Sequence, residues 1–217
     1  MRARGRRAIR PAHGAETAIA VRTLAPDEAL GVASLLARAF RDSPLNVAVI
    51  GGTPERRLRV NLHGMRALLP TAARCARVAA ADRSGLMLGA LIATPPLCYP
   101  VPPAPLASRI RCLLGQGPGV TRRWAAVFRA LDALHPREPH WYLATLGVDP
   151  DSQGEGIGSA LASSFLKWAD RDARPAYLET DRPENVSFYE RLGFRVEHEV
   201  EVLGAPIWRM LRTAASP

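Results

Sequence analysis

The chain passes from a predicted strand into a predicted helix through Gln153-Gly154-Glu155-Gly156-Ile157-Gly158, which we call the glycine loop. Three of its six residues lack a Cβ atom, so the backbone can turn sharply and a ligand can approach it closely. Amide N–H groups at the start of a helix are unpaired, and the helix dipole adds partial positive charge, so this loop suits a pyrophosphate. The Gln153 side chain adds an amide donor. A glycine-rich turn that binds nothing is the alternative that the loop alone leaves open.

The residues on either side of the glycine loop predict a strand and a helix. Residues 140–148 form an apolar run that favours a strand. After the loop, apolar residues recur at helical spacing and predict an amphipathic helix over 157–170, at Ile157, Leu161, Phe165 and Trp168. The loop lacks the Lys-Ser/Thr pair of a Walker motif, and it does not follow the first strand as a dinucleotide-binding loop does. The pattern therefore indicates an anion site of another kind.

The rest of the chain alternates between the two element types. We expect a strand over 17–24 and a helix that opens at Pro26. Further expected helices lie at 54–69, 106–116, 121–134 and 184–192, and further strands at 75–80, 86–94, 176–180, 194–202 and 207–211. The core-facing residues of the first two helices are Leu30, Leu35, Leu36 and Phe40, then Leu58, Leu62, Met65 and Leu69. Residues 42–52 are expected to be mobile, and 95–105, with six prolines, to be irregular.

The charge of the chain is unevenly distributed and argues against a nucleic-acid site. The net charge is +9, of which residues 1–16 carry +4 through five arginines and one glutamate. Among the 29 basic residues, Lys167 is the single lysine, which indicates a compositional bias. No basic helix is interleaved with aromatic residues. We expect a flexible basic arm at 1–16, a solvated basic surface, and no nucleic-acid partner.

The apolar runs and the cysteines indicate in which compartment the protein is expected. No apolar run approaches the roughly 20 residues that span a bilayer, and the start of the chain lacks a secretory signal. Cys75, Cys98 and Cys112 are odd in number and contain no CxxC pair, which favours reduced thiols over a disulfide framework or a metal site. We therefore expect a cytoplasmic protein without membrane contact and without a metal.

Three motifs in order resemble the Gcn5-related N-acetyltransferase (GNAT) superfamily. They are Leu146-Gly147-Val148-Asp149-Pro150, then Gln153-x-x-Gly156-x-Gly158, then Asn185-x-x-x-Tyr189-Glu190-Arg191-Leu192-Gly193-Phe194. Their order and spacing agree with the superfamily over residues 140–212. The stretches 141–148, 176–180 and 188–194 look most like the puromycin N-acetyltransferase branch, as a relationship of scaffold and not of antibiotic specificity.

The resemblance implies a fold and a cosubstrate. The fold is the GNAT fold, an α/β (α+β) arrangement in one domain over 17–213, with its cofactor-binding core at 140–194. Its central sheet is mixed and mostly antiparallel, flanked by helices and splayed at the acetyl-CoA cleft. In that superfamily the glycine loop, here Gln153, Gly154, Glu155, Gly156, Ile157 and Gly158, holds the pyrophosphate of coenzyme A. Glu155 would repel phosphates if it pointed inward, so we expect it to face solvent.

Further site residues follow from the same resemblance. Leu146 and Val148 would pair with the pantetheine arm, and a backbone N–H near Leu146 would polarise the thioester carbonyl. Gly147 either eases this close approach or is a packing glycine. Asn185 resembles a residue that contacts the pantetheine arm. Tyr189 matches the general acid that protonates the departing thiolate, and a core tyrosine beneath the cofactor is the alternative.

The general base is less well defined. Many relatives place a glutamate on the strand before the loop, but residues 141–148 contain no carboxylate. Glu179 and His140 are the candidates; the alternatives are a structural ion pair for Glu179 and an exposed strand end for His140. A base is not required for every acceptor, because an amine with a pKa of about 8 is about one-tenth neutral at pH 7, against under about a thousandth for a lysine-like amine. The missing carboxylate favours an amine of low pKa.

These residues predict an acetyl-CoA-dependent N-acetyltransferase that acts by direct attack in a ternary complex. The acceptor is expected to be a primary amine of a small molecule, bound near residues 40–52 and 95–99, on a monomer or homodimer. The alternatives are acetylation of a protein N-terminus or lysine, and a non-catalytic CoA-binding regulatory domain.

Overall fold

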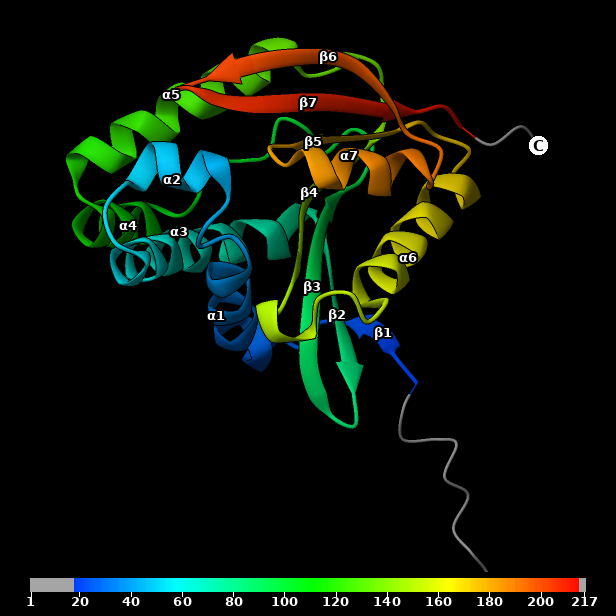
Figure 1. Cartoon of the computed structure of the whole chain (residues 1–217), viewed down its shortest axis with the longest axis horizontal. Helices are drawn as coiled ribbons and strands as arrows, with labels where there is room; N and C mark the ends of the chain where they lie inside the picture. Colours follow the sequence, from blue (N-terminus) through cyan, green and yellow to red (C-terminus); the bar gives the residue numbers. More distant parts are fainter. Residues whose placement is uncertain (1–17, 215–217) are drawn as a thin grey trace, which may run out of the picture.

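The computed structural model describes residues 18–214, which form a seven-stranded sheet surrounded by helices (Figure 1). The strand order is β1-β2-β3-β4-β5-β7-β6. Neighbouring strands are antiparallel except for the central pair β4 and β5, which is parallel. The strands are β1 (Ala20–Thr23), β2 (Arg77–Arg83), β3 (Leu86–Thr94), β4 (Trp141–Val148), β5 (Ala176–Thr180), β6 (Arg195–Val202) and β7 (Ala205–Arg212).

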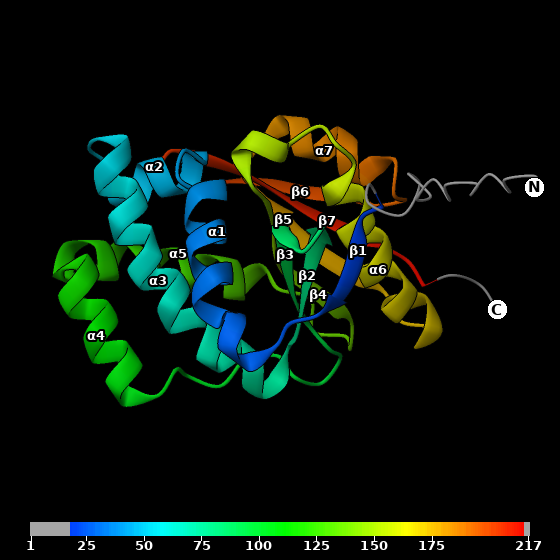
Figure 2. The ribbon, with the colours of Figure 1, turned by 90° about the horizontal axis from the view of Figure 1, so that it is seen from below.

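Helices cover both faces of this sheet (Figure 2). On one face, α1 (Ala29–Ala39) and α3 (Pro54–Cys75) pack on β3, and α2 (Pro44–Ile50) packs on β7. On the other face, α6 (Ile157–Arg171) packs on β1 to β4, and α7 (Pro183–Glu190) packs on β5 and β6. The remaining helices are α4 (Leu106–Gln116), α5 (Pro118–Leu134) and the short 3-10 helices η1 (Pro26–Glu28) and η2 (Pro150–Ser152).

The core is divided by the sheet. The cluster on the α6 face joins Trp141, Phe165 and Met210, all with no exposed surface. The α1 face holds a second cluster around Leu36 and Ile92. Alternation along each strand sends successive side chains to opposite faces, which is why neighbouring residues of β2 and β3, such as Val78 and Ala79 or Ala90 and Leu91, belong to different clusters.

The predicted elements are confirmed with shifts of a few residues at their ends. The helix after the glycine loop, the strand 176–180, the irregular stretch 95–105 and the hairpin around Ser84-Gly85 all form. Both turn residues of that hairpin have positive φ, 52° and 79°, as a tight hairpin turn requires. The mixed sheet with helices on both faces confirms the predicted fold class.

Three expectations about helices are wrong. Residues 44–50 are not a mobile stretch but the helix α2, because Ser43 caps its first turn and Pro44 occupies the first helical position. The helix α3 continues past residue 69 to Cys75 despite Pro70. Leu30 does not face the core: it is 64% exposed, whereas Leu35 and Leu36 are buried.

Two further expectations concern the basic arm and the membrane. The basic arm at residues 1–16 lies outside the described residues. Within residues 18–214, no helix is long and apolar enough to cross a membrane.

Candidate functional site

The parallel strands β4 and β5 separate partway along their length. Register pairs join Trp141 to Ala176, Tyr142 to Tyr177, and Leu143 to Leu178, and none follows. The register between β4 and β3 also shifts at this point, because Ile92 pairs with Thr145 and Ala93 with Leu143, which leaves Ala144 as an extra residue. We call the region beyond these pairs, residues 144–148 of β4 and 179–180 of β5, the fork. The β4 backbone in the fork has a free edge toward β5.

The glycine loop lies at the end of this free edge. Gly154 and Gly156 have φ of 82° and 84°, in the left-handed region that favours glycine, and Gly156 is the N-cap of α6. Residues 153–156 are exposed to solvent. The backbone N–H groups from Gly154 to Ser159 make no hydrogen bond within residues 18–214. These donors, at the positive end of a 15-residue helix, form a site for an anion.

Apolar side chains line the passage from the loop into the fork. A Cβ atom on Gly158 would lie 3.7 Å from Val148, 3.9 Å from Leu146 and 4.0 Å from Phe188. Gly158 therefore faces a small apolar space between β4 and α7. Gly147 faces the other way, because its Cβ would lie 2.7 Å from Leu36 and 3.1 Å from Ala39. The structure thus supports the packing explanation of Gly147: its missing side chain lets α1 lie directly on β4.

The acidic residue in the glycine loop is compensated. Glu155 is 41% exposed at its side chain and forms an ion pair with Arg83 from the end of β2. It faces solvent, as expected. The Arg83 cation offsets the charge of this carboxylate, so the loop remains suited to an anion. Gln153 folds back, its Nε2 donating to the Val148 carbonyl oxygen at 3.5 Å.

The α7 helix brings Asn185 and Tyr189 to the α6 face of the fork. The Asn185 amide donates to the Thr180 hydroxyl at 3.1 Å, which fixes it beside the last residue of β5. The Tyr189 ring packs edge-on against Phe188 and Phe194. Burial raises the pKa of the Tyr189 hydroxyl well above its usual value, so this phenol stays protonated at any physiological pH. Its hydroxyl makes no hydrogen bond to another residue of the described chain.

The Glu179 side chain lies on the opposite face of the sheet. Ala176 and Leu178 belong to the α6-face cluster, so Tyr177 and Glu179 point toward the α1 face. The Tyr177 hydroxyl donates to Glu179 Oε1 at 2.7 Å, and Arg209 Nε donates to the Tyr177 hydroxyl at 3.1 Å. The Glu179 side chain is 8% exposed. The two candidate catalytic residues, Tyr189 and Glu179, therefore approach the fork from its two faces.

His140 is not an exposed strand end. It is 7% exposed, and its Nε2 lies 3.0 Å from Nε2 of His135. His135 in turn has Nδ1 3.9 Å from Glu179 Oε1. The two base candidates thus belong to one buried polar group, which we call the aromatic cluster. Its members are Tyr99, His135, His140, Tyr142, Tyr177 and Glu179.

Sequence reasoning missed most of this cluster. Tyr99 comes from the proline-rich stretch 95–105, and His135 caps the C-terminal end of α5. Tyr99 and His135 stack with ring centroids 3.5 Å apart, and Tyr142 meets both rings edge-on. The one signal in the sequence is the alternation of β4 and β5, which places Tyr142 and Tyr177 on the same face as Glu179.

Two contacts position the segments around the fork. Arg38 at the end of α1 forms an ion pair with Asp149, just after β4. Asp181, just after β5, accepts a hydrogen bond from the Leu45 N–H at 2.8 Å, which holds the start of α2 near the end of that strand. The predicted acceptor segment 40–52 is thereby anchored beside the fork.

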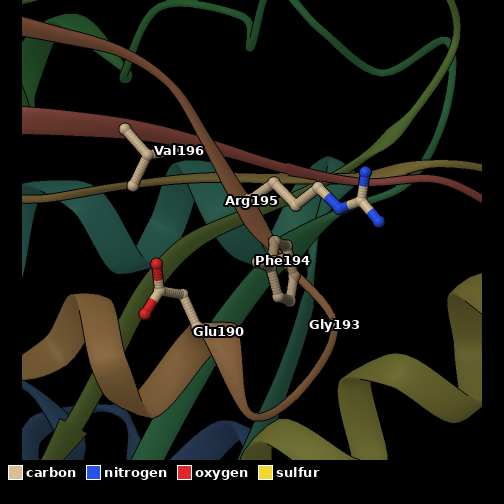
Figure 3. A pocket seen from close by; sticks show the side chains of 5 residues that line it. All are labelled: Glu190, Gly193, Phe194, Arg195 and Val196. Atoms are coloured by element: carbon tan, nitrogen blue, oxygen red, sulfur yellow. The ribbon is translucent and has the colours of Figure 1, made fainter.

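A surface hollow of about 580 Å³ lies apart from the glycine loop, between the C-terminal end of α7 and the start of β6 (Figure 3). Its walls are Glu190, Gly193, Phe194, Arg195 and Val196. None of these residues was predicted to bind the cosubstrate.

The site agrees with the comparisons with known proteins. Residues 115–194 match the acetyltransferase (GNAT) family model. The mycothiol acetyltransferase of Streptomyces coelicolor is 36% identical over 73 residues, which cover 32% of this chain and 23% of that protein. The chain therefore spans about a quarter of the length of the curated relatives it matches.

Solved structures share the whole fold. A Corynebacterium glutamicum protein described as histone acetyltransferase HPA2 and related acetyltransferase superposes with a TM-score of 0.71 at 21% identity, over 92% of this chain and 98% of that one. The polyamine N-acetyltransferase of Drosophila melanogaster superposes with a TM-score of 0.61 at 13% identity, over 90% and 100%. The chain is thus similar to the GNAT family model over residues 115–194, and residues 18–214 share the fold of these solved acetyltransferase structures.

Proposed function

We propose that this chain transfers an acetyl group from acetyl-CoA to a primary amine. The observation that carries the proposal is the position of the fork: the free edge of β4 leads directly to the unpaired N–H groups of the glycine loop. A ligand that is extended, polar along its length and anionic at one end fits this combination. Acetyl-CoA has this shape, with an amide-containing arm and a pyrophosphate.

The residues present fit this cosubstrate. The N–H groups from Gly154 to Ser159 would hold the pyrophosphate, and the backbone of Leu146 and Val148 would pair with the pantetheine amides. Gly158 leaves room between Leu146 and Phe188 for the arm. Asn185 keeps its amide oxygen available for the same arm, since the hydrogen bond to Thr180 uses only its nitrogen. Acetyl-CoA supplies the thioester that the acceptor nitrogen attacks.

Tyr189 and Glu179 divide the proton chemistry in this proposal. Tyr189 is a permanently protonated phenol, and it stabilises the departing thiolate by donating a hydrogen bond to sulfur. Glu179 is the carboxylate at the fork, and it removes protons from the acceptor nitrogen on the other face of the sheet. A backbone N–H near Leu146 polarises the thioester carbonyl.

The acceptor is proposed to be a small molecule. Mycothiol acetyltransferase and polyamine N-acetyltransferase act on small molecules by their names, which supports this choice. We further propose a scaffold relationship to the puromycin N-acetyltransferase branch, on the resemblance of the stretches 141–148, 176–180 and 188–194. The protein-acetylating alternative has one supporting observation, the histone acetyltransferase title of a structural neighbour.

Release of free thiol from acetyl-CoA tests the proposal. Purified protein is mixed with acetyl-CoA and a panel of alkylamines, polyamines and amino sugars, and in parallel with a peptide pool. We expect thiol release with at least one small amine, and a loss of about 10²-fold or more in kcat for Tyr189→Phe. Ser163→Ala, on the exposed side of α6, is the matched control that removes a hydroxyl elsewhere. Binding of acetyl-CoA without thiol release from any acceptor contradicts the enzyme reading.

A further inference from the structure

The aromatic cluster extends the base beyond Glu179. His135 lies beside Glu179, His140 lies at the other end of the His135 ring, and the His135 side chain and His140 are both buried. His140 also lines a pocket of about 80 Å³ together with Tyr99 and Glu138. This inference rests on the proposed function, and it concerns how many protons the site must handle in one turnover.

Acetylation of a charged amine removes two protons from nitrogen. The ammonium nitrogen carries three hydrogens and the nitrogen of the product amide carries one. One of these protons ends on the sulfur of coenzyme A, which leaves as a free thiol. The other proton must leave the site. A single carboxylate holds one proton at a time, so Glu179 must be emptied between the two removals.

The hydrogen-bond polarity of the two histidines suits them to this task. His140 Nδ1 lies 2.6 Å from the Glu138 carbonyl oxygen, which can only accept, so Nδ1 carries the hydrogen. In neutral His140, Nε2 is then an acceptor, and it takes the Nε2–H of His135 across 3.0 Å. Neutral His135 is left with an unprotonated Nδ1, and this atom faces Glu179. Its distance to Oε1, 3.9 Å, exceeds a usual hydrogen bond of about 2.9 Å by about 1 Å, a gap that a carboxyl rotation or one water closes.

We propose that His135 takes the first proton from Glu179 and stores it, as an imidazolium hydrogen-bonded to His140, until the product leaves. Glu179 first removes a proton from the ammonium nitrogen, and the resulting carboxylic acid passes it to Nδ1 of His135. The restored carboxylate takes the second N–H proton as the C–N bond forms and the C–S bond breaks. Tyr189 keeps its proton and donates a hydrogen bond to the departing sulfur, and the thiolate takes this second proton from Glu179 through solvent. The stored proton returns through Glu179 to water, and every residue regains its starting state.

The groups packed around His135 neither take the stored proton nor donate a proton of their own. Desolvation by burial lowers the pKa of His140, which keeps it a neutral acceptor. Burial raises the pKa of Tyr99, Tyr142 and Tyr177, so these hydroxyls stay protonated. The charged groups nearby are Asp132, which accepts from the Tyr99 hydroxyl, and Arg209, which donates to the Tyr177 hydroxyl; Arg137 and Glu138 line the pocket beside His140. In this proposal His135 does not touch the acceptor or acetyl-CoA, and it acts on the reaction only through Glu179.

Acceptors of different charge separate this role from a structural one. An alkylamine is charged near pH 7 and loses two protons, whereas an alkoxyamine of the same length is neutral and loses one, so it needs no store. For His135→Phe, which keeps a ring against Tyr99, we expect kcat with the alkylamine to fall at least about tenfold and kcat with the alkoxyamine to change by less than about twofold. His135→Gln should give the same ratio. His198→Phe, on the exposed strand β6, is the matched control and should change neither rate.

Two further readouts make the outcome decisive. The alkylamine deficit of His135→Phe should shrink as pH rises toward the pKa of the amine, because the first proton is then absent. Nitrogen-15 NMR of histidine-labelled wild type near pH 7 should show His140 as the Nδ1–H tautomer and His135 as the Nε2–H tautomer. Equal losses with both acceptors, a deficit independent of pH, or His135 protonated at Nδ1 would each overturn the proton store. Failure of the wild type to release thiol from any amine contradicts the proposed function instead.

Discussion

At the scale of single residues, Gly147 has a packing role that its place in a family motif conceals. A Cβ atom there would lie 2.7 Å from Leu36 and 3.1 Å from Ala39. We expect Gly147→Ala to destabilise the fold by about 1–3 kcal/mol, as overpacking does. Gly119 in α5 is the matched control, since a Cβ there meets nothing within 4 Å, and Gly119→Ala should not destabilise. Urea unfolding of both variants checks this, and equal stabilities would refute the packing role.

The charge at Glu155 is expected to matter little for the cosubstrate. Its carboxylate is exposed and paired with Arg83. We therefore expect Glu155→Lys to leave KM for acetyl-CoA unchanged or lower, because a solvent-screened cation adds weak attraction to phosphates. Glu197→Lys, the same charge change on β6, controls for net charge. A several-fold rise in KM for the loop variant alone would show that the carboxylate supports the anion site.

Burial of His140 predicts a dependence of stability on pH. Desolvation lowers its pKa in the folded protein, whereas in the unfolded chain the pKa is about 6.5. Between these two values only the unfolded chain is protonated at this position. The stability that His140 contributes is therefore fully present above about pH 6.5 and is lost as pH falls through the folded pKa. Between pH 7.5 and pH 5.5, the free energy of unfolding should fall by less in His140→Gln than in the wild type. An equal fall in both proteins would contradict this.

At the scale of elements, local signals in the sequence predicted nearly every strand and helix. The exception is α2. The residues Ser43 and Pro44 are helix-start signals, but the seven-residue helix that follows is too short to show a period, and the flanking Gly51-Gly52 suggested a loop. Its stability comes from tertiary contacts, because Val49 and Ile50 are buried against β7 and α5. Long-range packing of this kind cannot be seen in the local sequence.

The cap of α2 is therefore worth testing. The Ser43 hydroxyl accepts a hydrogen bond from the Asn46 N–H at 3.3 Å. We expect Ser43→Ala to cost about 0.5–2 kcal/mol, the usual range for a lost N-cap. Ser163→Ala, inside α6 and exposed, removes the same hydroxyl without a cap and should cost nothing. Thermal unfolding of the two variants gives the comparison, and a cap variant as stable as the control would remove the explanation of this helix.

The candidate site likewise has a part that local sequence predicts and a part that only the folded chain assembles. The glycine loop and α7 were predicted because their residues are close in sequence and their chemistry depends on local backbone. The aromatic cluster was not, because it joins the loop at Tyr99, the end of α5 at His135, and β4 and β5. These segments lie far apart in the sequence, with 80 positions between Tyr99 and Glu179, so only the folded sheet brings them together.

At the scale of the whole molecule, the outer strand β6 presents its edge to solvent. Glu197, Glu199 and Glu201 are exposed along it, and charged side chains protect an edge from pairing with another chain. We expect Glu197→Val/Glu199→Val to associate in a concentration-dependent way, seen by light scattering after gel filtration. Glu55→Val/Glu184→Val, on helices, loses the same charge. Association of the helix variant to the same extent would show that the edge is not the cause.

The fork also leaves the middle of the sheet with a short ladder between β4 and β5. The β4–β5 ladder has three register pairs, all near one end, while the ladders on either side, β1 to β4 and β5-β7-β6, continue for most of their strands. The sheet therefore has two continuous halves that are joined by a short parallel ladder. We therefore expect a molecule in the fork to contact both halves of the sheet, so that a small change in the angle between the halves would alter these contacts without breaking a ladder.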